Sequence, residues 1–161
     1  MPDCFSTEKR SQVMAQIKST GTLPETRLGA LLALWLPEEE ILHAPKEIVG
    51  RPDFVLTARK IAIFLDGCFF HGCPQHYREP KQNSEYWLAK VARNRRHDKQ
   101  VTKALKAAGW RVIRIWEHEL RTPKMTGRDR IRRRIRYALA ASSTESVLPQ
   151  AAEERAEYIL N

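Results

Sequence analysis

The chain has 161 residues, enough for one domain with a sizeable core, and a formal net charge of +9 from 28 Lys and Arg against 19 Asp and Glu. Such an excess predicts a polyanionic partner, either nucleic acid or an anionic membrane surface. No apolar run approaches the roughly 18 residues of a membrane span, the N-terminus has no apolar signal core, and three cysteines make no disulfide framework, so we expect a cytoplasmic protein without membrane association.

The first quarter of the chain predicts two helices. Ser6 or Thr7 can cap a helix that ends near residue 17, and the polar stretch KSTGT separates it from the next one. TLPE is a capping box, with Thr22 at the N-cap, Pro24 just inside the helix and Glu25 three residues on. Apolar side chains then recur at helical spacing, so this second helix should pack on a core; they are Leu28, Leu31, Leu32 and Trp35.

The middle of the chain predicts a hairpin, a long helix and a further strand. RPDFVLTARKIAIFL is typical of two buried strands, over about 53–57 and 60–65, joined by a short turn. A helical pattern runs from Ser84 to about residue 108, where Gly109 ends it, and RVIRIW predicts a strand over 111–116. A strand, a helix and a strand in this order predict a mixed α/β sheet flanked by helices.

The C-terminal part predicts a basic helix followed by a tail. Ile131, Ile135 and Leu139 recur every four residues within a helix expected over about 127–139, whose arginines are expected to form a solvated face. We therefore divide the chain into one domain, residues 1–140, and a tail, residues 141–161, that is either disordered or helical.

Sulfur and imidazole side chains crowd into the segment after the second strand. Four of them lie between residues 68 and 76, and His118 follows the third strand. A structural zinc ion takes four such ligands, usually in close pairs joined by loops. In one possible ligand set Cys68 pairs with His71 across two residues. The set that we favour leaves His71 free, ties the loop to the end of the third strand, and consists of Cys68, Cys73, His76 and His118.

Two aspartates stand at neighbouring strand ends, Asp53 at the start of the first strand of the hairpin and Asp66 after the second. Such oxygen ligands, brought together, hold Mg²⁺ for phosphodiester hydrolysis. On the long helix, a stripe that steps by four and three residues has two polar members, Asn94 and Asp98. Either they form an ordinary buried network, or the stripe crosses an active site where Asn94 meets a phosphate or water. In the second case Asp98 fixes the tautomer of a neutral His71, which takes a proton from water.

Several strings resemble, in order, the very short patch repair (Vsr) DNA mismatch endonucleases. They run over about residues 6–121 and are TEKRSQVMAQIKSTGT, PET, GRPDFV, FLDGCFFHGCPQHY, EYWLAKVARNRRHD and GWRVIRIWEHEL. The resemblance implies a restriction-endonuclease-like fold of the PD-(D/E)xK type, with a mixed central sheet, a structural zinc ion and a Mg²⁺-dependent nicking site. It also implies cleavage of one DNA strand on the 5′ side of the thymine in a T·G mismatch, which arises when 5-methylcytosine deaminates, as the first step of very short patch repair.

Carried over by position, the resemblance assigns the residues of the nicking site. Asp53 resembles the Mg²⁺ ligand and His71 resembles the general base. Asp98 resembles the supporting acid, and Glu25 matches an acidic residue that lies at the site.

Asp66 departs from the family, in which this position is often His. An acid there is closer to the general nuclease pattern of two acids on neighbouring strands. That pattern has Lys two residues after the second acid, where this chain has Cys68, so His71 is the better candidate for the base.

The resemblance also assigns contacts with DNA. Phe69 and Phe70 resemble an aromatic wedge that enters the base stack beside the mismatch, and Met14, in an N-terminal DNA-contacting helix within residues 1–20, matches a residue that inserts from the other side. The alternative for each ring is a place in the core, although consecutive residues of a strand-like segment point to opposite faces. The groups expected at backbone phosphates are Lys9, Arg10, Lys18, Arg93, Arg95 and Arg96. We expect a monomer that binds double-stranded DNA with a T·G mismatch, with mismatch-repair proteins as further partners.

Two other functions are alternatives to the nicking of a mismatch. A non-catalytic zinc-containing DNA-binding module would explain the net charge and the aromatic pair, but not the acids and the histidine expected at one end of the sheet. A nuclease of the same fold with another substrate would explain all of them.

Overall fold

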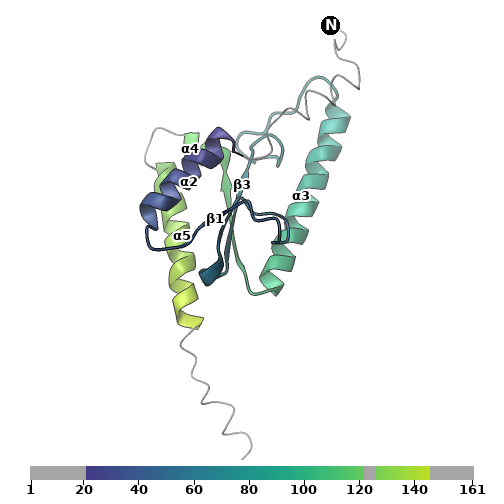
Figure 1. Cartoon of the computed structure of the whole chain (residues 1–161). Helices are drawn as coiled ribbons and strands as arrows, with labels where there is room; N and C mark the ends of the chain where they lie inside the picture. The colour runs from purple at the N-terminus through teal and green to yellow at the C-terminus, as the bar shows by residue number, and fades with distance from the viewer. Residues whose placement is uncertain (1–20, 122–125, 146–161) are drawn as a thin grey trace, which may run out of the picture.

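A mixed sheet of four strands, in the order β1-β2-β3-β4, forms the centre of the molecule (Figure 1). The computed structural model describes residues 21–121 and 126–145. The strands are β1 (Leu42–His43), β2 (Phe54–Leu56), β3 (Ile61–Asp66) and β4 (Arg111–Trp116). The first three pair antiparallel in succession, and β4 lies parallel to β3. The expected mixed sheet is therefore confirmed, with the hairpin and the third predicted strand side by side.

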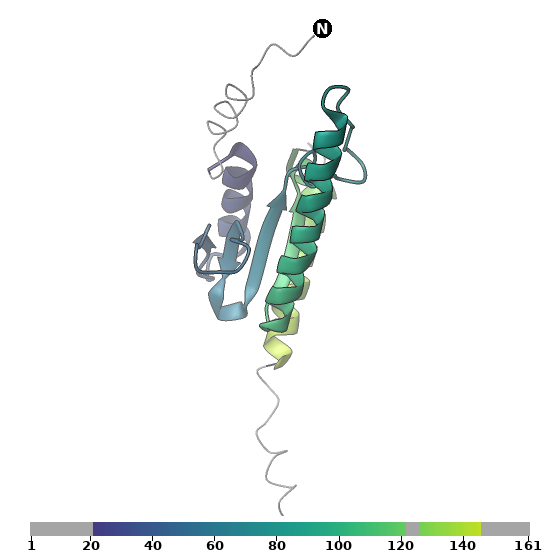
Figure 2. The same cartoon turned by 90° about the vertical axis from the view of Figure 1, so that its right-hand side faces the viewer.

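Helices cover both faces of this sheet (Figure 2). α3 (Ser84–Ala107) packs on one face, where Val101 and Leu105 belong to a core with Phe64 of β3. The other face is covered by α2 (Leu23–Trp35), α4 (Glu117–Arg121) and α5 (Thr126–Glu145). Within the described part of the chain, no helix combines the length and the apolarity that a membrane span requires.

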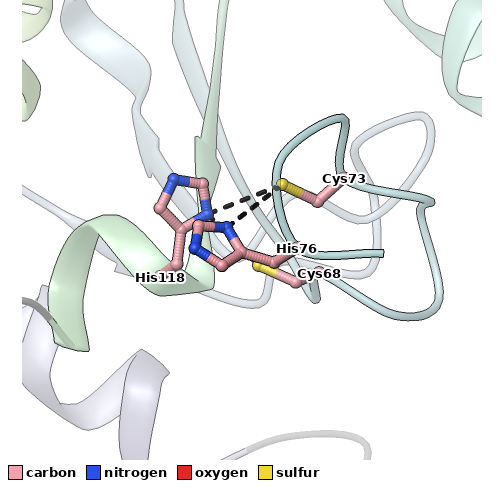
Figure 3. A group of neighbouring side chains, drawn as sticks. All are labelled: Cys68, Cys73, His76 and His118. Atoms are coloured by element: carbon pink, nitrogen blue, oxygen red, sulfur yellow. Dashed lines mark hydrogen bonds between the residues drawn. The ribbon is translucent and has the colours of Figure 1, made fainter. Parts of the chain in front are cut away.

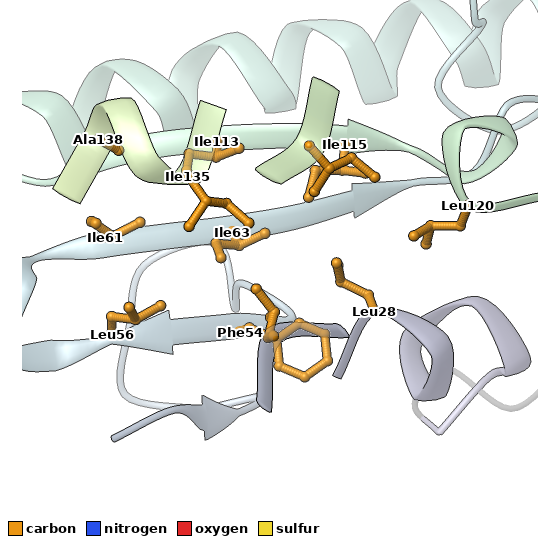
Figure 4. Close-up of a cluster of buried hydrophobic side chains, with 12 residues drawn as sticks. Leu28, Phe54, Leu56, Ile61, Ile63, Ile113, Ile115, Leu120, Ile135 and Ala138 are labelled. Carbon is orange, nitrogen blue, oxygen red and sulfur yellow. The ribbon is translucent and has the colours of Figure 1, made fainter. Parts of the chain in front are cut away.

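β3 contributes to both cores because its side chains alternate between the two faces of the sheet. Ile61 and Ile63 enter the larger core, where they meet Ile135 of α5 (Figure 4). Ala62 and Phe64 enter the smaller core under α3. A strand that is buried on both faces reads as a continuous apolar run, which is why KIAIF shows no alternation.

The secondary structure differs from the prediction at three short elements and at the end of α5. The connection between β2 and β3 is a 3₁₀ turn, η1 (Thr57–Arg59), closed by Lys60 with a φ of 49°. β1 has two residues and α4 has five, too few for a periodic pattern to reveal them. α5 continues to Glu145, past the expected end of the basic helix, and takes up the start of the predicted tail.

Several predictions fall outside the described residues. These are the first helix with Met14 and Lys18, the basic residues Lys9 and Arg10, and the remainder of the tail from residue 146.

Candidate active site

Four of the side chains that the sequence analysis singled out, each from a different part of the fold, line one cavity of about 220 Å³ beside β3 and the middle of α3. Asp53 precedes β2 and Asp66 ends β3, whereas His71 lies in the following loop and Asp98 lies on α3. Asp53 is tied to β3 directly, because its Oδ2 accepts the backbone N–H of Leu65 at 2.7 Å. The structure therefore brings together the histidine and the three aspartates that the sequence analysis singled out.

The loop before β2 closes one side of this cavity by lying against α3. Gly50 has a φ of +77°, and a Cβ atom there would lie 2.2 Å from Cγ1 of Val101. A larger residue at this position would push the loop away from α3 and displace Asp53, which follows three residues later.

His71 and Asp98 form a hydrogen-bonded pair. Nδ1 of His71 lies 2.7 Å from Oδ2 of Asp98 and 3.7 Å from Oδ1 of Asp66. Because an ionised carboxylate only accepts hydrogen bonds, the proton of a neutral His71 sits on Nδ1 and the lone pair stays on Nε2. One interpretation of the polar stripe on α3 was that it crosses an active site where Asp98 orients His71. The contact between Asp98 and His71 agrees with that interpretation.

Burial raises the pKa of Asp53 to about 6. The backbone N–H of Leu65 opposes this change, whereas the negative charges of Glu25 and Asp66 add to it. A carboxylate held among other acids lacks charge compensation, which a divalent cation bound to it would supply.

Asp53→Asn should stabilise the protein in Mg²⁺-free buffer above pH 6. The folded-state pKa of about 6 exceeds the ordinary value of 3.8, so the contribution of this carboxyl to stability is present below pH 3.8 and is lost as the pH rises through 6. The amide avoids that loss and keeps an acceptor for Leu65, which gives a gain of about 1–3 kcal/mol at pH 7.5 and almost none at pH 4. Urea unfolding of the parental protein and of Asp53→Asn at pH 7.5 and at pH 4 measures this gain. Equal stability of the two proteins at pH 7.5 would contradict the raised pKa of Asp53.

Glu25 lies close enough to Asp53 to raise its pKa, and it is almost completely buried. Its Oε2 accepts the backbone N–H of Gly21 at 2.9 Å, and its Oε1 accepts the hydroxyl of Thr22 at 2.7 Å. Oε2 also lies 3.3 Å from Nε2 of His43 in β1, a neighbour that the sequence analysis missed. Thr22 is the N-cap of α2 as predicted, but the glutamate reaches back to residue 21 instead of the N-cap amide of a capping box.

Arg114 is the main residue of this site that sequence reasoning missed. Its Nε donates to Oδ2 of Asp66 at 2.7 Å, and its Nη2 lies 2.6 Å from Oδ1 of Asp66 and 2.8 Å from Oδ1 of Asp98. Burial alone would lower the pKa of Arg114, but the hydrogen bonds and charges of the two aspartates outweigh burial and raise it. A signal was present, because this arginine interrupts the apolar string VIRIW of a strand.

Cys68, Cys73, His76 and His118 converge in a second cluster (Figure 3), with all four donor atoms within 4.8 Å of one another. Nδ1 of His118 lies 3.2 Å from Sγ of Cys68 and 3.6 Å from Sγ of Cys73. Nδ1 of His76 lies 3.8 Å from Sγ of Cys73. Four donors around one zinc ion, at bonds of about 2.0–2.3 Å, are spaced about 3.3–3.8 Å apart. The donor set therefore fits a tetrahedral zinc ion.

The environment of this cluster disfavours charge on its ligands. Burial raises the pKa of the Cys68 thiol. Burial also lowers the pKa of His118, and the positive charge of the neighbouring His76 adds to that effect. A thiolate at this position therefore needs an added cation, which a bound metal ion provides.

The rings of Phe69 and Phe70 pack together beside Trp87, near the start of α3. The Phe69 centroid lies 5.4 Å from that of Phe70 and 4.8 Å from that of Trp87. The expectation that the two rings point to opposite faces was wrong, because residues 68–72 form successive turns and not a strand. Phe70 is 39% exposed and Phe69 is partly buried, so Phe70 is the ring that this loop presents to solvent.

Two side chains of α3 hold the backbone of this loop. Nδ2 of Asn94 donates to the carbonyl of Phe70 at 2.8 Å, and Arg95 donates to the carbonyls of His71, at 3.3 Å, and of Gly72. Gly72 has a φ of +64°, and a Cβ atom there would lie 2.6 Å from an α3 side chain. Arg95 was expected at a phosphate, and Asn94 either in a buried network or at a phosphate or water. In the structure both fix the loop that carries the ring and the imidazole.

The other basic residues differ in their surroundings. Arg93 and Arg96 on α3 are exposed, as a contact with phosphate requires. The solvated face expected on α5 is interrupted at Arg134, which lies 2.7 Å from Oε2 of Glu119 and donates to the carbonyl of Arg114 at 2.9 Å. Arg134 therefore fastens α5 to α4 and β4.

Known proteins resemble this chain over most of its length. A family model described as DNA mismatch endonuclease Vsr matches residues 2–78. The type II nicking enzyme V.NaeI of Lentzea aerocolonigenes is 44% identical over 113 residues, which are 68% of this chain and 68% of that protein. The type II nicking enzyme V.NmeDIP of Neisseria meningitidis serogroup C is 36% identical and covers 83% of this chain and 90% of its own length.

A mismatch endonuclease and a solved structure are also similar. DNA mismatch endonuclease Vsr of Escherichia coli (strain K12) is 34% identical over 122 residues, which are 75% of this chain and 77% of that protein. The catalytic domain of the homing endonuclease I-Bth0305I superposes with a TM-score of 0.48 at 19% sequence identity, and covers 76% of this chain and 98% of that domain.

Proposed function

Because the chain belongs to the Vsr family of DNA endonucleases, we propose that it nicks one strand of double-stranded DNA on the 5′ side of the thymine in a T·G mismatch. Such a mismatch is the product of 5-methylcytosine deamination, and the nick would start very short patch repair. Relatives that are named as a mismatch endonuclease and as nicking enzymes support this proposal. Matched or single-stranded DNA is the competing substrate, and binding without cleavage is the competing function.

The observation that carries the proposal is the His71–Asp98 pair in the same cavity as Asp53. A general base needs a free lone pair and a fixed orientation, and the 2.7 Å contact with Asp98 supplies both for Nε2 of His71. A module that only binds DNA does not require a hydrogen-bonded His71–Asp98 pair next to Asp53, a carboxylate with which no lysine or arginine of the described residues forms an ion pair.

In the proposed mechanism Asp53 is the Mg²⁺ ligand, and Glu25 adds negative charge close to it. A bound Mg²⁺ would supply positive charge to the phosphate and the leaving oxygen in the transition state. Nε2 of His71 takes the proton of the attacking water, and the imidazolium that results is stabilised by Asp98. The cavity of about 220 Å³ has room for a water and part of a phosphate between these groups.

We assign a structural zinc ion to Cys68, Cys73, His76 and His118. The ion would tie the loop after β3 to the start of α4. It would thereby hold Phe70, which lies in this loop, in a fixed position relative to the start of α3. A mismatched base step is easier to unstack than a paired one, by up to a few kcal/mol, so an exposed ring held rigidly favours entry at the mismatch. Phe69, which contacts both Phe70 and Trp87, would help to hold the ring of Phe70 in place.

The remaining proposals concern the partner and its location. The net charge of +9 supports double-stranded DNA as the partner, and the exposure of Arg93 on α3 supports a phosphate contact there. We propose that the protein acts as a monomer in the cytoplasm, with mismatch-repair proteins as later partners on the nicked DNA.

A panel of labelled DNAs tests the function. T·G, T·A and C·G duplexes of one sequence, and the single strand alone, are incubated with Mg²⁺ or with EDTA, and each strand carries its own label. We expect one nick, in the thymine strand of the T·G duplex, with Mg²⁺ only. Binding of the T·G duplex without cleavage would indicate a DNA-binding module, and equal cleavage of matched or single-stranded DNA would indicate a nuclease with another substrate.

A further inference from the structure

One guanidinium joins the two carboxylates that flank His71. Nε and Nη2 of Arg114 contact the two oxygens of Asp66 at 2.7 and 2.6 Å, and Nη2 reaches Oδ1 of Asp98 at 2.8 Å. The second oxygen of Asp98 is the one that contacts Nδ1 of His71 at 2.7 Å. Both oxygens of Asp98 are thereby engaged, and the plane of its carboxylate is fixed by Arg114 on one side and His71 on the other.

Asp66 and Asp53 differ in how their charge is met. Asp66 is 4% exposed, and the fork of Arg114 engages both of its oxygens in a bidentate pair. Asp53 accepts a backbone N–H, and within the described part of the chain no lysine or arginine forms an ion pair with it. A divalent cation would have to compete with the partly buried Arg114 for Asp66, whereas at Asp53 it would meet an uncompensated carboxylate.

Arg114 is placed at some cost to the fold. Its guanidinium gains a cation–π contact with the ring of Phe64, 4.8 Å from the centroid, but its Nη1 is buried without a hydrogen-bond acceptor in the described part of the chain. A buried donor without a partner destabilises the folded state, and apolar pairs often replace buried ion pairs without loss of stability. The contact with Phe64 alone is therefore a weak reason for an arginine at this position of β4.

We propose that Arg114 is a positioning residue of the nicking site, which keeps Asp66 out of metal coordination and holds Asp98 in the orientation that receives the Nδ1–H of His71. Asp53 is then the strand-end acid that takes the divalent cation. This inference rests on the proposed function and extends it, since it assigns a role to Asp66, whose part in the nicking site the sequence left open.

Metal binding tests the part that concerns Asp66, without any use of activity. Titration calorimetry with Mn²⁺, after the zinc site has been filled, is run on the parental protein, on Asp66→Asn and on Asp53→Asn. We expect Asp66→Asn to bind Mn²⁺ with a Kd within about threefold of the parental value, and Asp53→Asn to weaken binding by about 30-fold or more. Equal losses in the two variants would make Asp66 a metal ligand and overturn the proposal.

Nicking kinetics together with stability test the part that concerns Asp98. Arg114→Met should lower kcat on the T·G duplex by about 100-fold with little change in KM, and Arg114→Lys should restore only part of it, because a lysine cannot bridge two carboxylates with a planar fork. The double variant Asp66→Asn/Arg114→Met should recover the parental Tm but not kcat. Recovery of both would mean that Arg114 only balances charge for folding, and would overturn the positioning role.

The two proposals fail in different ways. If the parental protein nicks none of the DNAs in the panel, the proposed function fails, and the Mn²⁺ titrations still decide whether Asp66 binds metal. If the parental protein nicks the T·G duplex and Arg114→Met nicks it equally fast, the proposed function stands and the inference about Arg114 is wrong.

Discussion

Asp53→Asn is expected to lower Mg²⁺-dependent nicking of a T·G duplex by about 10³-fold or more, because a metal ion contributes several kcal/mol to the transition state and each 1.36 kcal/mol is a factor of ten. Binding of the intact duplex should stay within about threefold of the parental value, since contacts with backbone phosphates dominate affinity. Single-turnover cleavage and a filter-binding titration without Mg²⁺ measure the two quantities.

Two features make this result specific. The same substitution is expected to stabilise the fold above pH 6, so a loss of nicking does not report unfolding. Glu38→Gln is the matched control, because it also turns an acid into an amide but lies exposed in the loop after α2. If Asp53→Asn nicks at the parental rate, or if Glu38→Gln loses as much, the assignment of the Mg²⁺ site is wrong.

The second large effect is expected at the zinc cluster. Cys73→Ser combined with His118→Asn removes one ligand from the loop after β3 and one from α4, and should abolish zinc binding. Loss of a structural metal is among the few changes that cost about 4 kcal/mol or more, which lowers the Tm of a domain of this size by about 8–16 °C. Elemental analysis should find one zinc per parental chain and none in the variant, and calorimetry measures the Tm.

His71→Gln is the control for that pair, and it also separates the two ligand sets left open by the sequence. In the structure His71 is turned to Asp98 and does not belong to the group of Cys68 and Cys73. We expect His71→Gln to keep its zinc and its Tm and to lose nicking. Zinc retained in the double variant, or lost in His71→Gln, would favour the set in which Cys68 pairs with His71.

Local patterns were sufficient to predict most of the fold. The apolar stripe of α3 and the continuous apolar string of β3 both follow from burial, and burial leaves a periodic trace in the sequence. The same trace pointed to Asp98, since a polar member of a buried stripe must have a partner. The cavity that collects Asp53, His71 and Asp98 is thus the consequence of strand ends and one helix face meeting at a single place.

Contacts between distant segments could not be predicted in this way. Nothing local indicates that Arg114 pairs with Asp66, 48 positions earlier, because only the parallel pairing of β3 and β4 brings them together. The same holds for Asn94, whose amide meets a loop carbonyl 24 positions away. A polar residue within an apolar strand signals that a partner exists, but the partner is known only once the topology is known.

The most direct test of the central claim is a crystal structure of the protein with a T·G duplex and Ca²⁺ in place of Mg²⁺, under conditions in which the duplex stays intact. We expect an ion about 2.3–2.6 Å from a carboxylate oxygen of Asp53. Nε2 of His71 should lie about 2.6–3.2 Å from a water that faces the phosphorus on the 5′ side of the thymine. An ion bound elsewhere, or a scissile phosphate out of reach of that nitrogen, would contradict the account.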